Sequence, residues 1–131
     1  MKKYIFTFLF ICISLFLFSS TVYSEIIDLN DSNFQKEVFD KNSDKLVVVG
    51  FYNTNCPKCQ IQTLVFRNLE KDSAVKDVKM VMINGIINVE SANSLNINGY
   101  PALVFVKRGK ILEICGLREE EALKKLITKY K

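Results

Sequence analysis

The sequence predicts an α/β domain in which helices flank both faces of a central mixed β-sheet. Along residues 25–131, runs of β-branched apolar residues alternate with segments whose apolar positions recur at helical spacing. The last two apolar runs are joined by a short connection that contains a glycine, which is typical of an antiparallel hairpin. Alternation favours parallel strand pairs and the hairpin adds an antiparallel pair, so the predicted sheet is mixed.

The first predicted elements are a short edge strand over residues 26–29 and a helix that Ser32 caps, with Gln35 completing a capping box. The apolar residues on one face of this helix are Phe34, Val38 and Phe39. Residues 45–52 form a nearly continuous apolar, β-branched run. Such a run is typical of a strand that is buried on both faces.

The next helix begins at Cys56-Pro57, because proline is favoured at the first helical position, where its missing N–H group costs nothing. Its apolar positions are Ile61, Leu64, Val65 and Leu69. A strand over residues 78–83 and a short helix over residues 89–95 follow.

The predicted hairpin joins strands at residues 101–106 and 111–115 through residues 107–110. Residues 119–130 then form an amphipathic helix, with acidic residues at its start and lysines at its end, as the helix dipole favours. Its apolar stripe consists of Ala122, Leu123, Leu126, Ile127 and Tyr130.

Residues 1–24 differ from the rest of the chain. Two lysines precede the apolar run 4–18, and small and polar residues follow it, which is the pattern of a secretory signal peptide cleaved before Glu25. Residues 4–24 carry no charge, so an uncleaved membrane anchor is the alternative. Both interpretations export residues 25–131 as one domain, to a periplasmic, extracytoplasmic or secreted location where disulfides persist.

Composition excludes several classes of function. The 131 residues include no histidine, which rules out Ser-His-Asp and Cys-His catalysis and any histidine-ligated haem or zinc. The formal net charge is only +4, and basic residues are interspersed with acidic ones, so we expect no nucleic-acid partner.

The chemistry of the chain is expected at Cys56-Pro57-Lys58-Cys59, between a buried strand and a helix. The first helical turn stabilises a thiolate, which lowers the pKa of Cys56 from about 8.5 toward 7 or below. Cys59 is placed to resolve a mixed disulfide. A zinc site needs four ligands and residues 25–131 hold three cysteines, while a purely structural disulfide gains little stabilisation from so short a loop. A redox-active dithiol is the favoured interpretation.

Over nearly all of residues 26–130 the chain resembles the thioredoxin family. The resemblance rests on the run at residues 47–52 that leads into the cysteine pair, on Gly99-Tyr100-Pro101 about forty residues later, and on Gly109 and Gly116. It implies a thioredoxin fold and a cis Tyr100–Pro101 bond that faces the cysteines. It also implies a groove for extended substrate chains, which Pro101 shapes and Tyr100 lines.

The chain departs from the family pattern around the cysteines. Thioredoxins usually carry Trp-Cys-Gly-Pro-Cys, and Gly50 stands where they have a buried aspartate that helps move the proton of the resolving thiol. That proton must then pass to water, Lys58 or another group. Proline followed by a basic residue resembles the bacterial periplasmic disulfide oxidases, and Gly-Tyr-Pro resembles the protein disulfide isomerases. Both comparisons predict a pair that is more oxidising than that of ordinary thioredoxin.

Two further side chains are candidates. Lys58 is either a solvated surface lysine or a cation that stabilises the Cys56 thiolate and, with Pro57, raises the reduction potential. Cys115 is either a small apolar strand residue, an additional redox thiol beside the groove that the resemblance implies, or a site of intermolecular pairing.

We therefore predict a thiol–disulfide oxidoreductase that acts in cell redox homeostasis on protein disulfides outside the cytoplasm, by exchange at Cys56 and Cys59. No cofactor or metal is expected, because the cysteine pair carries the electrons. The expected partners are protein thiols or disulfides and an electron donor or acceptor, with a membrane only if the N-terminal segment is retained, and we expect a monomer. The alternatives are a disulfide oxidase or isomerase, and a non-catalytic peptide-binding module whose cysteine pair stays locked.

Overall fold

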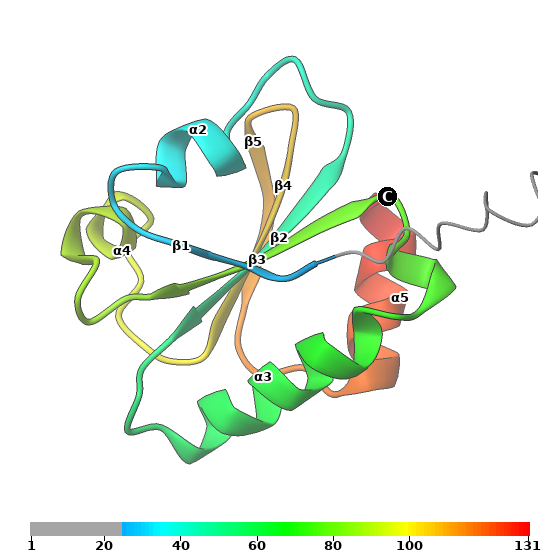
Figure 1. The fold of residues 1–131 in the computed structure, drawn as a ribbon. Coiled ribbons are helices and arrows are strands. Elements are labelled where there is room, and N and C mark those ends of the chain that lie inside the picture. The colour runs from blue at the N-terminus through cyan, green and yellow to red at the C-terminus, as the bar shows by residue number, and fades with distance from the viewer. Residues whose placement is uncertain (1–24) are drawn as a thin grey trace, which may run out of the picture.

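The computed structural model describes residues 25–131, which form a five-stranded sheet in the order β1-β3-β2-β4-β5 (Figure 1). The strands are β1 (Ile27–Leu29), β2 (Leu46–Tyr52), β3 (Val78–Asn84), β4 (Ala102–Lys107) and β5 (Lys110–Cys115). β1 and β2 run parallel to β3, whereas β4 pairs antiparallel with both β2 and β5. The prediction of a mixed sheet that ends in a hairpin is confirmed. The segment 1–24, predicted as a signal peptide or anchor, lies outside the described residues.

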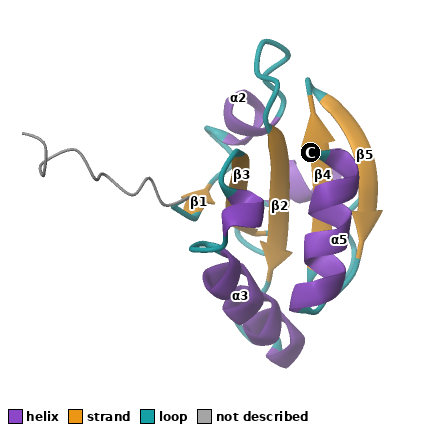
Figure 2. Cartoon of the chain, turned by 90° about the vertical axis from the view of Figure 1, so that its right-hand side faces the viewer, coloured by secondary structure: helices purple, strands orange, loops and turns teal. Residues whose placement is uncertain are grey.

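Helices cover both faces of the sheet, as the sequence predicts. They are α2 (Phe34–Val38), α3 (Pro57–Leu69), α4 (Val89–Ser94) and α5 (Glu120–Tyr130), with a 3-10 turn η1 (Ser73–Val75) that the sequence analysis did not predict. Figure 1 shows α2 and α4 on one face and α3 and α5 on the other, and in Figure 2 α3 and α5 lie on the side nearer the viewer. Within residues 25–131, none of the helices combines the length and apolar character needed to cross a membrane.

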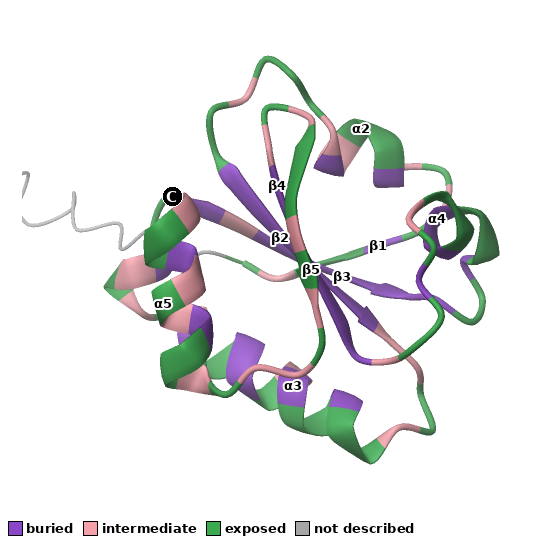
Figure 3. Cartoon of the chain, turned by 180° about the vertical axis from the view of Figure 1, so that it is seen from behind, coloured by how far each residue is buried: buried purple, intermediate pink, exposed green. Residues whose placement is uncertain are grey.

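The central strand β2 is buried on both faces, which is why its sequence is a continuous apolar run (Figure 3). Val47, Val49 and Phe51 pack into the layer under α2 and α4. Leu46 and Val48 pack into the other layer, under α3 and α5. Fully burying one such side chain contributes about 1.5–3 kcal/mol, so the two apolar layers around β2 are the main source of stability.

The predicted apolar face of α3 is wrong in part. Ile61 and Leu64 are 49% and 62% exposed, whereas Val65 and Leu69 are buried as expected. The buried face of the helix includes Gln62 and Phe66 instead. Periodicity alone assigned the stripe to the wrong apolar residues, because the buried face also includes a polar side chain. On α5 the prediction holds better, since Leu123 and Ile127 are fully buried and only Ala122 is exposed.

The predicted cap of the first helix is also wrong. α2 begins at Phe34, and Asn33 is its N-cap residue, without a side-chain capping bond. Ser32 lies in the preceding turn, where its amide donates to Oδ1 of Asn30 over 2.9 Å, and Asn33 Oδ1 accepts from the amide of Asn30 over 2.8 Å. The two asparagine side chains close this turn, and the Ser32 hydroxyl donates to Oδ1 of Asn30, so the Ser32 side chain bonds within the turn rather than to the helix.

The topology brings three segments to one edge of the sheet. β2 and β3 are parallel, and Tyr52 lies opposite Asn84, so both strands end at this edge. β4 runs antiparallel to β2, with Ala102 opposite Phe51, so it begins there. The segments after β2, after β3 and before β4 therefore meet, as is common for sites at the carboxyl ends of parallel strands.

Candidate functional site

Cys56 and Cys59 form a disulfide at the start of α3, with their Cα atoms 5.2 Å apart. Cys56 is the N-cap residue of the helix, and Pro57 follows at its first position. The amide of Cys59 donates to Sγ of Cys56 over 3.2 Å, which occupies one of the helix's unpaired N–H groups. Cys56 is partly exposed, whereas Cys59 is only 2% exposed. The sequence predicted the position of the pair at the start of the helix, and the structure adds that Cys56 is the more accessible of the two residues.

The Tyr100–Pro101 peptide bond faces this disulfide and is cis, as the resemblance implied. The carbonyl oxygen of Tyr100 lies 3.8 Å from Sγ of Cys56, within reach of a thiol proton when the pair is reduced. The Tyr100 ring packs against Gly85, where an added Cβ would lie 2.5 Å from Cε1 and 2.8 Å from Cζ of the ring. Burial raises the pKa of Tyr100 above its usual range, so the phenol is neutral at neutral pH.

A groove of about 390 Å³ runs beside the disulfide. It is lined by residues 96–102 and 114–117 and by Lys58. Four of the residues singled out from the sequence therefore share one surface: Lys58, Tyr100, Pro101 and Cys115. Lys58 is the one charged residue of this lining, and the open, mostly uncharged shape suits an extended chain better than a small charged ligand.

Cys115 is a free, half-buried thiol at the end of β5. It lies opposite Leu103 on β4 and packs against the apolar layer under α3 and α5. Burial raises the pKa of its thiol, and the nearby Arg118 offsets this only in part. The thiol is therefore protonated at neutral pH, which makes it a poor nucleophile.

Gln62 supports one wall of the groove, and the sequence analysis did not point to it. Its side chain is buried, and its amide group both donates to the carbonyl of Arg118 over 3.1 Å and accepts from the N–H of Arg118 over 2.8 Å. These bonds fasten α3, one turn beyond Cys59, to the loop that forms one wall of the groove. A polar residue among the apolar positions of α3 was the available signal.

Gly50 lies in β2 where the family has an aspartate, and the structure shows what takes the space. An added Cβ at Gly50 would lie 3.0 Å from Cε2 and 3.2 Å from Cζ of Phe66. The Phe66 ring is fully buried and fills the position that a side chain at residue 50 would need. The space that an aspartate side chain would need at residue 50 is thus occupied by an aromatic ring from α3.

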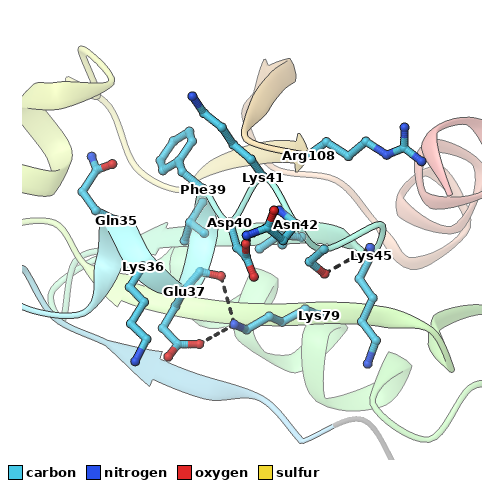
Figure 4. A pocket seen from close by; sticks show the side chains of 13 residues that line it. Gln35, Lys36, Glu37, Phe39, Asp40, Lys41, Asn42, Lys45, Lys79 and Arg108 are labelled. Carbon is cyan, nitrogen blue, oxygen red and sulfur yellow. Dashed lines mark hydrogen bonds and ion pairs between the residues drawn. The ribbon is translucent and has the colours of Figure 1, made fainter.

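A hollow larger than this groove lies elsewhere, between α2, the loop that leads to β2, and the β4–β5 hairpin (Figure 4). It measures about 570 Å³ and contains none of the predicted site residues. Lys79 donates to the carbonyl and the carboxylate of Glu37, and the labelled ammonium groups of Lys36 and Lys41 point in different directions. These cations do not converge on one point. Within residues 25–131, His, Cys, Asp and Glu side chains form no group of three that could hold a metal ion.

Comparisons with known proteins agree with this geometry. The model of the family Thioredoxin matches residues 25–129. A thioredoxin of Listeria monocytogenes is 31% identical over 106 residues, which cover 79% of this chain and 96% of that protein. A thioredoxin of Bacillus subtilis is 27% identical, covering 80% and 97%. The solved structure of a mutant thioredoxin from Halobacterium salinarum superposes with a TM-score of 0.72 at 26% identity, covering 86% of this chain and 96% of that one.

Proposed function

This chain belongs to the thioredoxin family, and on that premise we propose that it reduces disulfides of proteins outside the cytoplasm. Family membership and the Cys56–Cys59 pair make it a thiol–disulfide oxidoreductase that needs no cofactor beyond the cysteines. The observation that carries the proposed mechanism is the bond from the Cys59 amide to Sγ of Cys56. A donor aimed at that sulfur stabilises it as a thiolate, which is the reactive form.

The proposed reaction begins from the reduced pair. The Cys56 thiolate attacks one sulfur of the client disulfide, forms a mixed disulfide and releases the other client sulfur as a thiolate, which takes up a proton. Cys59 loses its proton and attacks the sulfur of Cys56, which forms the protein disulfide and releases the second client thiol. Two electrons pass from the pair to the client. Cys59 is 2% exposed, so it reaches Cys56 but not a client.

The nucleophile is assigned to Cys56 rather than Cys115 on physical grounds. Cys56 accepts a hydrogen bond at a helix N-terminus, which lowers a thiol pKa, whereas burial raises the pKa of Cys115. In the reaction, Pro101 shapes the groove beside the attacked sulfur and Tyr100 lines it. Cys115 keeps the role of a partly buried strand residue.

Lys58 is proposed to strengthen the same effect, because it lies in the first helical turn between the two cysteines and lines the groove. Lys58→Ala is expected to raise the pKa of Cys56 and lower the reduction potential. A change of about 1.4 kcal/mol in the thiolate corresponds to about 30 mV for a two-electron couple. Lys58→Arg is the matched control, and an unchanged pKa in Lys58→Ala removes the assignment.

The test of the function is reduction of insulin by the protein, with Cys56→Ser as the control. We expect turnover by the natural sequence and loss of at least about a thousandfold in the variant, because no second thiolate replaces the nucleophile. Cys59→Ser should instead accumulate the mixed disulfide, visible by mass spectrometry. A disulfide that stays locked in reducing buffer would favour the non-catalytic peptide-binding module.

The direction of thiol–disulfide exchange and the cellular location of the protein need separate measurements. Equilibration against glutathione buffers gives the reduction potential, and a value near that of the strongly oxidising family members, about −120 mV, would favour a disulfide oxidase or isomerase. Export rests on the pattern of residues 1–24. Sequencing the N-terminus of protein recovered from cells should find a chain that starts at Glu25, whereas an intact N-terminus in the membrane fraction favours the retained anchor.

A further inference from the structure

Three aliphatic side chains are exposed within four residues, where β3 passes into α4. Ile86 is 51% exposed, Ile87 is 75% exposed and Val89 is 51% exposed. Single exposed apolar residues are common on protein surfaces, whereas neighbouring ones form an apolar patch, which is a typical feature of contact surfaces. We call Ile86 and Ile87 the isoleucine ledge.

The ledge is held in place by two buried asparagines at the ends of its loop. Oδ1 of Asn84 accepts from the N–H of Ile86 over 3.0 Å. The carbonyl of Asn84 accepts from both the side-chain amide of Asn88, over 2.9 Å, and its backbone N–H, over 3.0 Å. The exposure of the isoleucines therefore belongs to an ordered turn with paired backbone groups.

A second set of bonds braces this turn from outside. Oδ1 of Asn88 accepts from the N–H of Asp31 over 3.0 Å. The carboxylate of Asp31 in turn accepts from the hydroxyl and the N–H of Ser91, over 2.6 and 2.9 Å. The bonds from Ser91 lower the pKa of Asp31, so the carboxylate stays charged at neutral pH. The loop is thus fastened to both the β1–α2 turn and the first turn of α4.

A short chain of contacts links Gly85, the residue before the ledge, to the disulfide. The N–H of Gly85, next to Ile86, donates to the carbonyl of Tyr52 at the end of β2 over 3.0 Å. The Tyr100 ring packs over Gly85, and the Tyr100 carbonyl lies 3.8 Å from Sγ of Cys56. Neither isoleucine lines the groove beside Pro101, so the ledge adds a separate apolar contact to the same edge of the sheet.

On the basis of the proposed function, we propose that Ile86 and Ile87 bind aliphatic side chains next to the reacting cysteine of an extended client polypeptide. We assign this surface to the client because it lies at the same edge of the sheet as the disulfide. A client must place its sulfur at Cys56, and the residues that flank its cysteine then lie over the neighbouring surface. The ledge has no charge of its own and is open, which suits a passing aliphatic side chain. It should therefore give the enzyme a preference for apolar sequence around the client cysteine.

The test uses two peptides that differ only beside their single cysteine, leucine in one and glutamine in the other, each joined to glutathione by a disulfide. The reduced full protein is mixed with each peptide, and release of peptide thiol is followed in a single turnover. We expect the leucine peptide to react about fivefold faster or more. The double variant Ile86→Gln/Ile87→Gln should bring this ratio close to one, while its rate with glutathione disulfide stays unchanged.

Ile111→Gln is the matched control, because Ile111 on β5 is 45% exposed and lies at the hairpin end of the sheet, away from the disulfide. It should keep the preference. The inference is overturned if the double variant retains the preference, or if it loses rate equally with both peptides and with glutathione disulfide. If the natural sequence reacts with none of the three disulfides, the proposed function itself fails, so the two failures are distinguishable.

Discussion

The surfaces at the two ends of strand β2 differ in their charge. At its carboxyl end lie the disulfide, the cis Tyr100–Pro101 bond and the isoleucine ledge, and the surface is largely uncharged. At its amino end lies the larger hollow, which is rich in charged side chains. There Lys79 pairs with Glu37 and Arg108 pairs with Asp44, so these charges are partnered within the chain.

The comparison teaches where a binding surface is left open. The paired groups at the amino end are satisfied by one another, which leaves little to gain from a ligand. At the carboxyl end, two isoleucines face solvent and one sulfur of the disulfide is accessible, although the loop that carries the isoleucines is hydrogen-bonded at both of its ends. The groove beside the disulfide is therefore the one that we propose to bind clients, although the hollow at the amino end is larger.

Matched glycine substitutions give the largest expected difference between the two ends. Gly85→Ala drives a Cβ into the Tyr100 ring, and Gly109→Ala places one at φ +73°, 3.1 Å from the carbonyl of Phe39. Each should lower the free energy of unfolding by about 1–3 kcal/mol in urea titrations. Only Gly85→Ala should also slow insulin reduction several-fold, since only there does the displaced ring belong to the residue that contacts Cys56.

The double variant Gly85→Ala/Tyr100→Val serves as the control for this pair, because the smaller side chain makes room for the added Cβ. It should recover most of the lost stability. Equal slowing of insulin reduction by Gly85→Ala and Gly109→Ala would contradict the assignment of catalysis to one end.

Gln62→Leu is expected to have an intermediate effect. It leaves the N–H and carbonyl of Arg118 without their partners, which costs about 1–3 kcal/mol of unfolding free energy. Because the freed loop forms a wall of the groove, KM for a disulfide peptide should rise more than kcat falls. Gln60→Leu, at an exposed position of the same helix, is the matched control and should change neither quantity.

At the amino end, Glu37→Gln should produce a stability change that depends on pH. The hydrogen bond from Lys79, followed by its charge, holds the pKa of Glu37 below its ordinary value of about 4.3. A depressed pKa means that the stabilisation is present above the ordinary value and is lost as pH falls through the folded-state value. Urea titrations should show the variant less stable at pH 7 and the difference shrinking toward pH 3, with insulin reduction at pH 7 unaffected.

The smallest effect is expected at the exposed pair Arg108–Asp44, whose side chains are 65% and 77% exposed. Arg108→Ala should change the free energy of unfolding by no more than about 0.5 kcal/mol, because solvent screens such pairs. Unfolding should be measured at low and at high salt. A loss of more than about 1 kcal/mol of unfolding free energy at both would show that this exposed pair stabilises the domain more than its exposure indicates.

Sequence alone predicted the parts of the site that depend on local chemistry. The position of Cys56 and Pro57 follows from the rules for a helix start, and the burial of β2 follows from its unbroken apolar run. The cis bond at Pro101 came from the family resemblance and is confirmed. The first two features depend on a few consecutive residues, whereas the cis bond depends on the resemblance to the family.

The missed features depend on partners that are distant in sequence. Gln62 is buried because the backbone of Arg118, 56 residues later, satisfies its amide. Helical periodicity contains no information on such a partner, so Ile61 and Leu64 were placed inside instead. Gly85 was missed for the same reason, because its importance depends on the Tyr100 ring that packs against it. Gly50 was singled out in the sequence, but its packing against Phe66 was not predicted.

The attachment of the first described residues has a practical consequence. The N–H of Ile26 donates to Oε1 of Glu70 over 3.1 Å, and Glu70 is the C-cap residue of α3. A helix of 13 residues spans about 20 Å, so the polypeptide enters the domain a full helix length from Cys56. A tag, carrier protein or membrane tether joined before residue 25 would therefore attach near the far end of α3 from Cys56. It would leave Cys56 accessible to large, folded proteins.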